Sequence, residues 1–280
     1  MNTMKKKKNQ ELAVIYLILM AAVIWTLFPF YWTAVTSFKN SAEIAAKPIT
    51  YWPKEFTLEN YVLSWKNGGF STYFANSLKI ALISTVFTVL FATMDGYALA
   101  RYKFRGKNAF LLLLLCTQFF PTAMLIIPLF KIYNAVKLIN NHWSLILTYT
   151  VFHIPFNAAL MRGFINGIPV SLEEAAMVDG CSRPKAVVWV LLPLLLPGMA
   201  AVSAYSFISC WNEYLYALMF ISAGSKYTVP VGLSMTIGEY SINYGQLCAG
   251  SMIALVPIII MFAYVQKYMV SGLGAGAVKG

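Results

Sequence analysis

The sequence predicts an all-α integral membrane protein with six transmembrane helices, and two observations lead to this fold class. First, 59% of the 280 residues are hydrophobic and only 11% are charged, whereas soluble domains carry about 45–50% apolar and about 25% charged residues. Second, six apolar stretches approach the ~20 residues that cross a bilayer as a helix. The composition therefore excludes a soluble domain.

The predicted spans follow one another along the chain, separated by polar connections. The first follows a Lys-rich segment, and its apolar run is too long for a cleaved signal peptide. The fifth is preceded by a further apolar run, in which Pro193 and Pro197 predict a bend. The six spans are 12–36, 75–99, 109–130, 143–161, 198–221 and 247–269. Outside the spans lie the N-terminal segment 1–11, the long connections 37–74 and 162–197 and the C-terminal tail 270–280, besides three further connections.

The distribution of Lys and Arg predicts that both termini lie in the cytoplasm. With six spans and the N-terminus inside, thirteen of these residues fall on the cytoplasmic side and seven on the outer side. Cytoplasmic connections carry such an excess, and it is strongest in the short connection 101–107. We therefore attribute the net charge of +11 to the orientation of the chain in the membrane and not to nucleic-acid binding, since no basic groove is visible in the sequence. The aromatic-rich outer connection 37–74 predicts either an interfacial segment, with or without an external partner, or a plain loop.

The cytoplasmic connection 162–197 contains a short acidic helix. Ser171 is a candidate N-cap, and Glu174 follows at the spacing of a capping box. Gly180 favours a left-handed stop. The resulting helix, 172–179, is about 12 Å long at ~1.5 Å per residue, far too short to cross a membrane. We expect it to dock on another component, with a second helix beginning at Ser182.

Few ionisable groups lie within the spans, and each is a candidate either for polar packing or for a functional path. Asp95, close to Arg101 and Lys103, forms either a buried ion pair or helix–helix contact, or part of a substrate path. His153 has no catalytic or metal partner at a recognisable spacing, and the four cysteines are read as packing residues. No phosphate-binding GxxxxGK[ST] motif is present. We therefore expect a chain that is not an enzyme and holds no metal.

Candidates for a substrate path lie in the third and fifth spans. The fifth combines aromatic faces with amide and carboxylate groups, which suits a polyhydroxyl ligand; interhelical hydrogen bonding is the alternative. In the third span, proline permits bending where the helix borders protein or water. The candidate residues are Gln118, Trp211, Asn212, Glu213 and Tyr214.

The acidic connection resembles a known motif. Glu174-Ala175-Ala176, Gly180, Val190 and Leu192-Pro193 have the spacing of the EAA loop found in permease subunits of ATP-binding-cassette (ABC) importers, with Val190 at a position that is normally isoleucine. Further stretches are similar to the MalG-like, maltose-permease branch that serves carbohydrate uptake. These stretches are 96–107, 117–130, 211–220, 228–233 and 270–280.

The resemblance implies a type I ABC importer permease with the MetI-like fold, its core spanning 75–269, in the cell membrane of a bacterium or archaeon. It implies a cytoplasmic coupling helix and a C-terminal tail that both reach the ATPase. The coupling residues would be Ser171, Glu173, Glu174, Ala175, Ala176, Asp179, Gly180, Leu192 and Pro193. The tail residues would be Gly272, Gly274, Gly276 and Lys279.

The same resemblance implies several partners. They are a homologous MalF-like permease subunit, a dimer of ATPase subunits, an extracytoplasmic sugar-binding protein and membrane lipid, with no nucleic acid. ATP and Mg²⁺ would be bound by the ATPase subunits and no cofactor by this chain. Two alternatives stay open: an importer of glycerol phosphate or another polyol built on the same machinery, and an autonomous secondary transporter.

Overall fold

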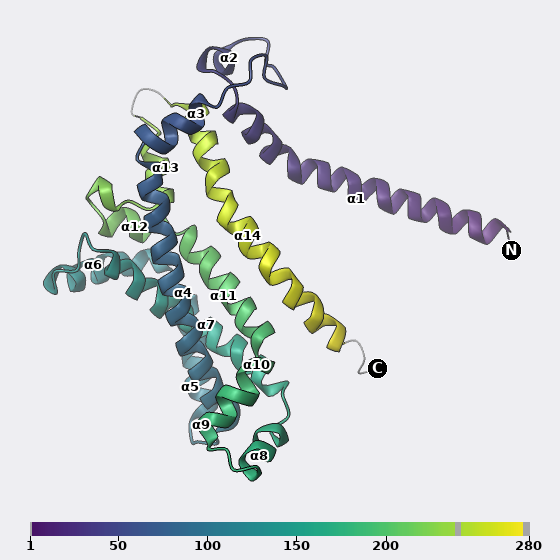
Figure 1. The fold of residues 1–280 in the computed structure, drawn as a ribbon, viewed down its shortest axis with the longest axis vertical. Coiled ribbons are helices and arrows are strands. Elements are labelled where there is room, and N and C mark those ends of the chain that lie inside the picture. The colour runs from purple at the N-terminus through teal and green to yellow at the C-terminus, as the bar shows by residue number, and fades with distance from the viewer. Residues whose placement is uncertain (1, 239–241, 277–280) are drawn as a thin grey trace. The chain divides into compact units, whose positions relative to one another are not determined.

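The computed structural model describes residues 2–238 and 242–276, and in this part of the chain the regular structure is helical apart from one isolated bridge between Ile237 and Ile242. The chain forms two compact units. One comprises residues 1–70 and 235–254, and the other comprises residues 71–234 and 255–280. Figure 1 labels the helices of each unit.

The first unit contains the long helix α1, Asn2–Ser37, which begins inside the segment that the sequence assigns to a polar N-terminal end. After α1 come α2 (Ser41–Ala45), α3 (Glu59–Val62), a π-helical turn η1 (Leu63–Asn67) and, later in the chain, the start of α14 (Tyr244–Gly276). The connection after α1 is ordered by side chains. Asn40 caps α2 by accepting from the Glu43 amide at 2.8 Å, and Asn60 donates to the carbonyls of Ser37 and Lys39.

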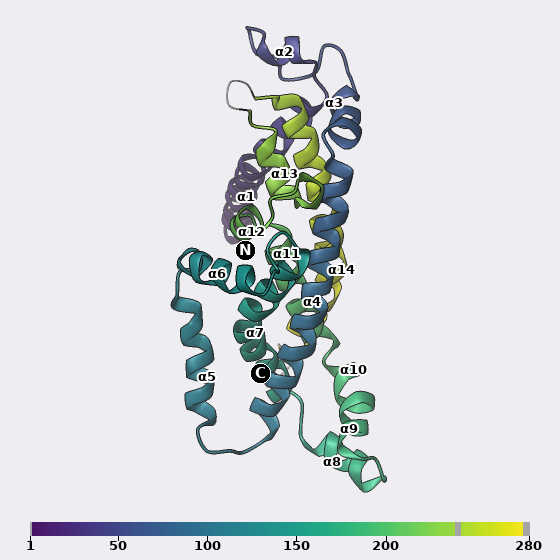
Figure 2. The same cartoon turned by 90° about the vertical axis from the view of Figure 1, so that its left-hand side faces the viewer.

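The second unit is built on α4 (Phe70–Arg101), α7 (His142–Asn166) and α11 (Leu196–Trp211). Both views show these three helices side by side (Figures 1 and 2). At the crossing of α4 and α7, Gly96 lies so near the other helix that a Cβ there would be 2.9 Å from the Arg162 amide nitrogen and from the Met161 Cβ. Glycine is therefore the residue that allows the two backbones to approach.

The predicted span 109–130 is not one helix, which corrects the sequence expectation. It consists of α5 (Lys107–Cys116), two 3₁₀ turns, η2 (Thr117–Phe119) and η3 (Thr122–Leu125), and α6 (Ile126–Ala135). The two arms meet at 91°, and the sharp bend between α5 and α6 is visible in Figure 2. Pro121 lies between the turns, and proline both lacks a donor and excludes helical continuation. The Thr122 carbonyl accepts from the Tyr216 hydroxyl at 2.6 Å.

The fifth predicted span is also interrupted. The helical segments α9 (Arg183–Ala186), η4 (Val187–Leu191) and α10 (Leu192–Leu194) form one arm, which meets α11 at 74°. The bend lies between Pro193 and Pro197, where the sequence predicts it. A second break at 212–214 separates α11 from α12 (Leu215–Phe220), so the predicted range 198–221 covers two helices.

Length and composition select four helices that could each cross a membrane: Glu11–Ser37, Phe70–Arg101, His142–Asn166 and Tyr244–Tyr268. Each of the two bent pairs adds one more crossing if it is counted as a single span. The total is then six, as the sequence predicts. The short elements η5 (Gly224–Lys226) and α13 (Val229–Met235) complete the described chain.

One apolar cluster joins the bent arm to the long helices of the second unit. Its fully buried members come from α7, from the arm and from α11. Half-buried side chains of α4, including Val89 and Tyr97, pack against it. The buried members are Met161, Ile165, Leu191, Leu195 and Val202. This cluster makes the bent arm part of the same packed body as α4, α7 and α11.

The close approach at Gly96 can be tested directly. We expect Gly96→Ala to lower the thermal unfolding midpoint of the detergent-solubilised protein, because overpacking typically costs about 1–3 kcal/mol and the atoms in the way include backbone. Gly163→Ala is the matched control, since a Cβ there meets nothing within 4 Å in this chain. Equal midpoints for the two variants would contradict the tight crossing.

Candidate functional site

The short acidic helix of the connection 162–197 is α8, Ser171–Val178, within one residue of its predicted limits. The predicted N-cap is wrong: Val170 occupies that position, and no side chain caps the helix. Val170 already has helical dihedrals, φ −63° and ψ −31°, and its carbonyl accepts the amides of Glu173 and Glu174. An N-cap residue has an extended backbone, and its side-chain oxygen accepts a hydrogen bond from the amide two or three residues later. Ser171 instead lies inside the helix, one residue past the N-cap position.

The other end of α8 stops as the sequence predicts. Gly180 has φ +91°, and its amide donates to the Met177 carbonyl at 3.1 Å while the Cys181 amide donates to the Ala176 carbonyl at 3.0 Å. These two bonds are the Schellman arrangement. A Cβ at Gly180 would meet nothing within 4 Å, so backbone conformation alone demands glycine there.

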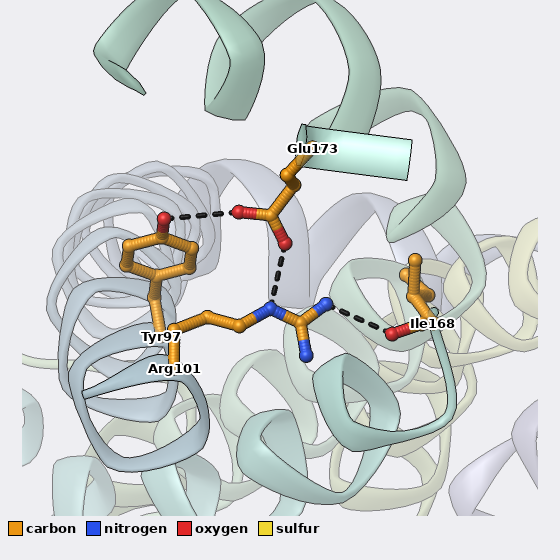
Figure 3. Close-up of polar contacts among 4 residues, drawn as sticks. All are labelled: Tyr97, Arg101, Ile168 and Glu173. Carbon is orange, nitrogen blue, oxygen red and sulfur yellow. Dashed lines mark hydrogen bonds and ion pairs between the residues drawn. The ribbon is translucent and has the colours of Figure 1, made fainter. Parts of the chain in front are cut away.

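A buried ion pair fastens α8 to the end of α4. The Nε of Arg101 donates to Glu173 Oε1 at 2.6 Å, and the hydroxyl of Tyr97 donates to Oε2 at 3.0 Å (Figure 3). The Nη2 of Arg101 donates to the Ile168 carbonyl at 2.9 Å, which holds the chain just before α8. Both charged side chains are only 6% exposed. The contact therefore joins two segments separated by 72 residues.

The remaining predicted coupling residues of α8 and its stop lie at the surface of this chain. Ser171, Glu174, Ala175, Asp179 and Gly180 are exposed, and Ala176 is half-buried. Large apolar side chains accompany them: Val170, Leu172 and Val178 are exposed, Val178 to 87%. We call this set the outer face of α8. Its two small alanines allow a close approach by another surface.

Leu192 and Pro193, the last two predicted coupling residues, begin α10. Leu192 packs against the buried cluster that contains Leu191 and Leu195, whereas Pro193 is exposed. A displacement of α8 can thus pass along two routes. One runs through Arg101 into α4, and the other runs through α9, η4 and α10 into α11.

Glu213, a predicted substrate residue, is fully engaged within the chain. It accepts from the Tyr149 hydroxyl at 2.5 Å and from the amides of Tyr216 and Ala217 at 2.8 and 3.1 Å. Carboxylates at a helix N-terminus satisfy amides that have no intrahelical partner. Glu213 therefore joins α7 to the first turn of α12 across the break at 212–214. These contacts favour the interhelical alternative for this residue.

The other predicted substrate residues do not form one site. Trp211 is buried against Phe74 and Phe207, while Asn212 is exposed and Tyr214 half-buried. Gln118 lies in η2 beside a hollow of about 570 Å³ whose lining is mostly apolar. Its amide makes only long contacts, at 3.4 Å, to Thr117 and to the Phe152 carbonyl.

The ion-pair reading of Asp95 is not supported, because Arg101 pairs with Glu173 instead. The His153 ring lies 2.6 Å from the Tyr149 carbonyl and 4.0 Å from the Cys210 sulfur. The four cysteines are free thiols. Of the predicted tail residues, Gly272, Gly274 and Gly276 belong to α14, and Lys279 lies outside the described residues.

Comparison with known proteins decides the family. Residues 92–270, more than half of the chain, match the family described as "Binding-protein-dependent transport system inner membrane component". This chain belongs to that family. A permease protein of a sulfoquinovosyl glycerol transport system from Agrobacterium fabrum is 37% identical, over 91% of this chain and 89% of its own length. The trehalose/maltose permease protein MalG of Thermococcus litoralis is 35% identical over 96% of each chain.

A solved structure places the fold in the same family. A chain of a bacterial ABC transporter involved in the import of the acidic polysaccharide alginate superposes with a TM-score of 0.81, at 25% identity, over 91% of this chain and 95% of that chain. The protein thus has the fold of an ABC importer permease, and it is a multi-pass membrane protein. This agrees with the fold class and the family that the sequence indicates.

Two residues of the permease site, Tyr97 and Arg101, escaped the sequence analysis. The sequence places Arg101 in the basic 101–107 connection and near Asp95, and Tyr97 in a span, but it pairs neither residue with Glu173. Glu173 was grouped with residues that face a partner, but its carboxylate faces inward. A signal was available, since Arg101 is the first cation after a long apolar helix and Glu173 adjoins the EAA motif. Their separation along the chain concealed the pairing.

The anchor predicts a local destabilisation. We expect Arg101→Ala to speed amide hydrogen exchange across residues 171–178, because leaving one partner of a buried pair uncompensated costs about 3–5 kcal/mol. Arg105→Ala, an exposed arginine in the same connection, is the matched control and should leave exchange unchanged. Equal exchange in both variants would show that the ion pair does not hold α8.

The Glu213 contacts predict a stability phenotype. We expect Glu213→Gln to lower the unfolding free energy by about 1.5–3 kcal/mol, the range for hydrogen bonds to a charged group, as measured by thermal unfolding of the purified permease. Replacing the exposed neighbour Asn212 with Ala should change it by less than about 0.5 kcal/mol. A variant with unaltered stability but altered cargo preference would instead place Glu213 in the substrate path.

Proposed function

We propose that this permease subunit carries carbohydrate, in particular oligosaccharide, as part of an ATP-driven importer. The support comes from relatives of nearly full length. Besides the trehalose/maltose protein, an arabinooligosaccharide permease protein of Halalkalibacterium halodurans is 34% identical over 99% of this chain and all of its own length. The cargo path would lie between this subunit and a second, homologous permease.

A charged cargo is the second candidate, because the names of two relatives indicate anionic compounds. One carries sulfoquinovosyl glycerol and the other belongs to the alginate importer. A membrane-embedded path for an anion needs cationic groups. Residues 80–100, 109–130, 143–161 and 198–221 contain neither Lys nor Arg. This favours an uncharged sugar for the part of the path that this chain supplies.

The element proposed to couple ATP hydrolysis to transport is α8. One observation carries this proposal: α8 is held by a buried ion pair on one side and presents a surface of acidic, small and apolar residues on the other. An ATPase subunit that seats on the outer face of α8 would move it as it closes. Because Arg101 and the bent arm connect α8 to α4 and α11, that movement would shift both helices as a packed body.

The complete importer would contain components that supply what this chain lacks. Two ATPase subunits would bind ATP and Mg²⁺, so this subunit would be no enzyme and bind no cofactor of its own. An extracytoplasmic binding protein would deliver the sugar. The tail residues from Gly272 to Lys279 would contact the ATPase. The Lys and Arg distribution supports cytoplasmic positions for both termini.

In this mechanism the state of the ATPase biases an equilibrium between inward-open and outward-open forms, which is a coupling free energy between two sites. Gln118, Asn212 and Tyr214 remain candidates to line the path, since their polar groups are not consumed as those of Glu213 are. Trp211 is a less suitable candidate because its ring is buried among other aromatic rings.

The stop at Gly180 offers the test of coupling. We expect Gly180→Val to leave membrane insertion intact but to lower sugar uptake relative to ATP turnover, because a side chain at φ +91° costs about 1–2 kcal/mol and would redirect α8. Gly180→Asn, which tolerates that backbone region, is the control and should remain coupled. The measurement is uptake of a labelled sugar panel, and ATP hydrolysis, in the reconstituted complex. Normal uptake by the valine variant would contradict the proposal.

A further inference from the structure

The connection after α1 does not simply leave the membrane surface; part of it folds back along α1. The hydroxyl of Tyr31 donates to the Tyr51 carbonyl at 2.6 Å, and the rings of Trp32 and Tyr51 meet edge to face at 5.8 Å. Tyr31 and Trp32 precede the end of α1 at Ser37 by five or six residues, about 8–9 Å at ~1.5 Å per residue. Tyr51 therefore lies beside the last turns of the span rather than beyond them.

The backbone of this returning segment is bonded to side chains of the same unit. The ammonium of Lys39, which is buried and lies 5.1 Å from the centre of the Trp32 ring, donates to the Thr50 carbonyl. With Tyr31 bonded to Tyr51, two successive carbonyls are satisfied without water. Backbone at membrane depth requires such internal partners, because lipid offers none.

The carboxylate of Glu43 also stabilises this turn. Glu43 Oε1 accepts from the Thr50 hydroxyl at 2.6 Å and from the Lys54 amide at 3.0 Å. These hydrogen bonds, the one from Thr50 first, lower the pKa of the Glu43 carboxyl. Lys39 and Glu43 therefore both hold the turn at Thr50, and Glu43 also holds it at Lys54.

The side chains that this turn presents outward are large and apolar. Ile49 is 63% exposed, Tyr51 67% and Trp52 69%. Lysines flank them on both sides in the stretch Lys47 to Lys54, KPITYWPK, which contains no acidic residue. Aromatic rings prefer the boundary between hydrocarbon and headgroups, and flanking lysines suit anionic headgroups.

We propose that Ile49, Tyr51 and Trp52 form an anchor that inserts into the outer membrane interface and fixes the depth of α1. The occupant of this surface is lipid rather than the binding protein. The Tyr51 ring lies back along α1, beside Trp32, whereas a protein arriving from the aqueous side would meet the outermost surface first. The proposal does not depend on the identity of the cargo.

The depth of Trp52 can be measured in the assembled importer. The complex is reconstituted in phosphatidylcholine and phosphatidylglycerol vesicles that carry bromine either high on the acyl chain or near its methyl end, and tryptophan emission is recorded. The contribution of Trp52 is the difference between the natural chain and Trp52→Phe. Trp25, 84% exposed on α1 and seven residues before Trp32, gives the matched deep control through Trp25→Phe.

We expect Trp52→Phe to remove emission that high bromines quench and that aqueous iodide does not reach, while Trp25→Phe removes emission quenched by the deep bromines. Adding the binding protein should not change the Trp52 component. Quenching by iodide without quenching by bromolipid would overturn the anchor. Protection from iodide that appears only with the binding protein would also overturn it and identify a docking surface instead.

Discussion

The contact between Glu173 and Arg101 is the interaction on which the functional arrangement of this permease depends. Without it, α8 would be attached to α4 by no ion pair, and eight residues of helix have little intrinsic stability in water. The ion pair and the Tyr97 hydroxyl give α8 a fixed position against α4. A rigid attachment is what lets a small element transmit force, because a loosely held one would yield instead of moving its neighbours.

The same requirement recurs wherever a span is broken: freed backbone groups must find partners inside the protein. Glu213 accepts the amides that begin α12, and the Tyr216 hydroxyl donates to a carbonyl freed beside Pro121. The link from α7 through Glu213 and Tyr216 thus ties together the breaks of the third and fifth spans. These side chains allow sharp bends at membrane depth without exposed polar backbone.

Much of the fold could be predicted because its signals are local. Apolar length indicated the number of crossings, and the spacing around Gly180 indicated both the turn and the family. Prolines marked the bend near Leu195, although the full break at Pro121 exceeded the bending that was expected. The contacts of the candidate site were harder to predict from the sequence. Glu213 was correctly singled out as unusual, but its partners Tyr149 and Ala217 lie on other helical segments, so its structural part in the α11–α12 break was only one of two open readings.

The sequence by itself determined the membrane class, the six crossings and the stop of α8, because hydrophobic length and the left-handed preference of glycine need no distant contact. Only the tertiary structure decided which way each acidic side chain faces. Glu173 and Glu174 are neighbours with the same chemistry, yet one is buried against Arg101 and the other is exposed. Helical geometry points adjacent residues in different directions, and the packing of α8 against α4 selects which of them meets the arginine.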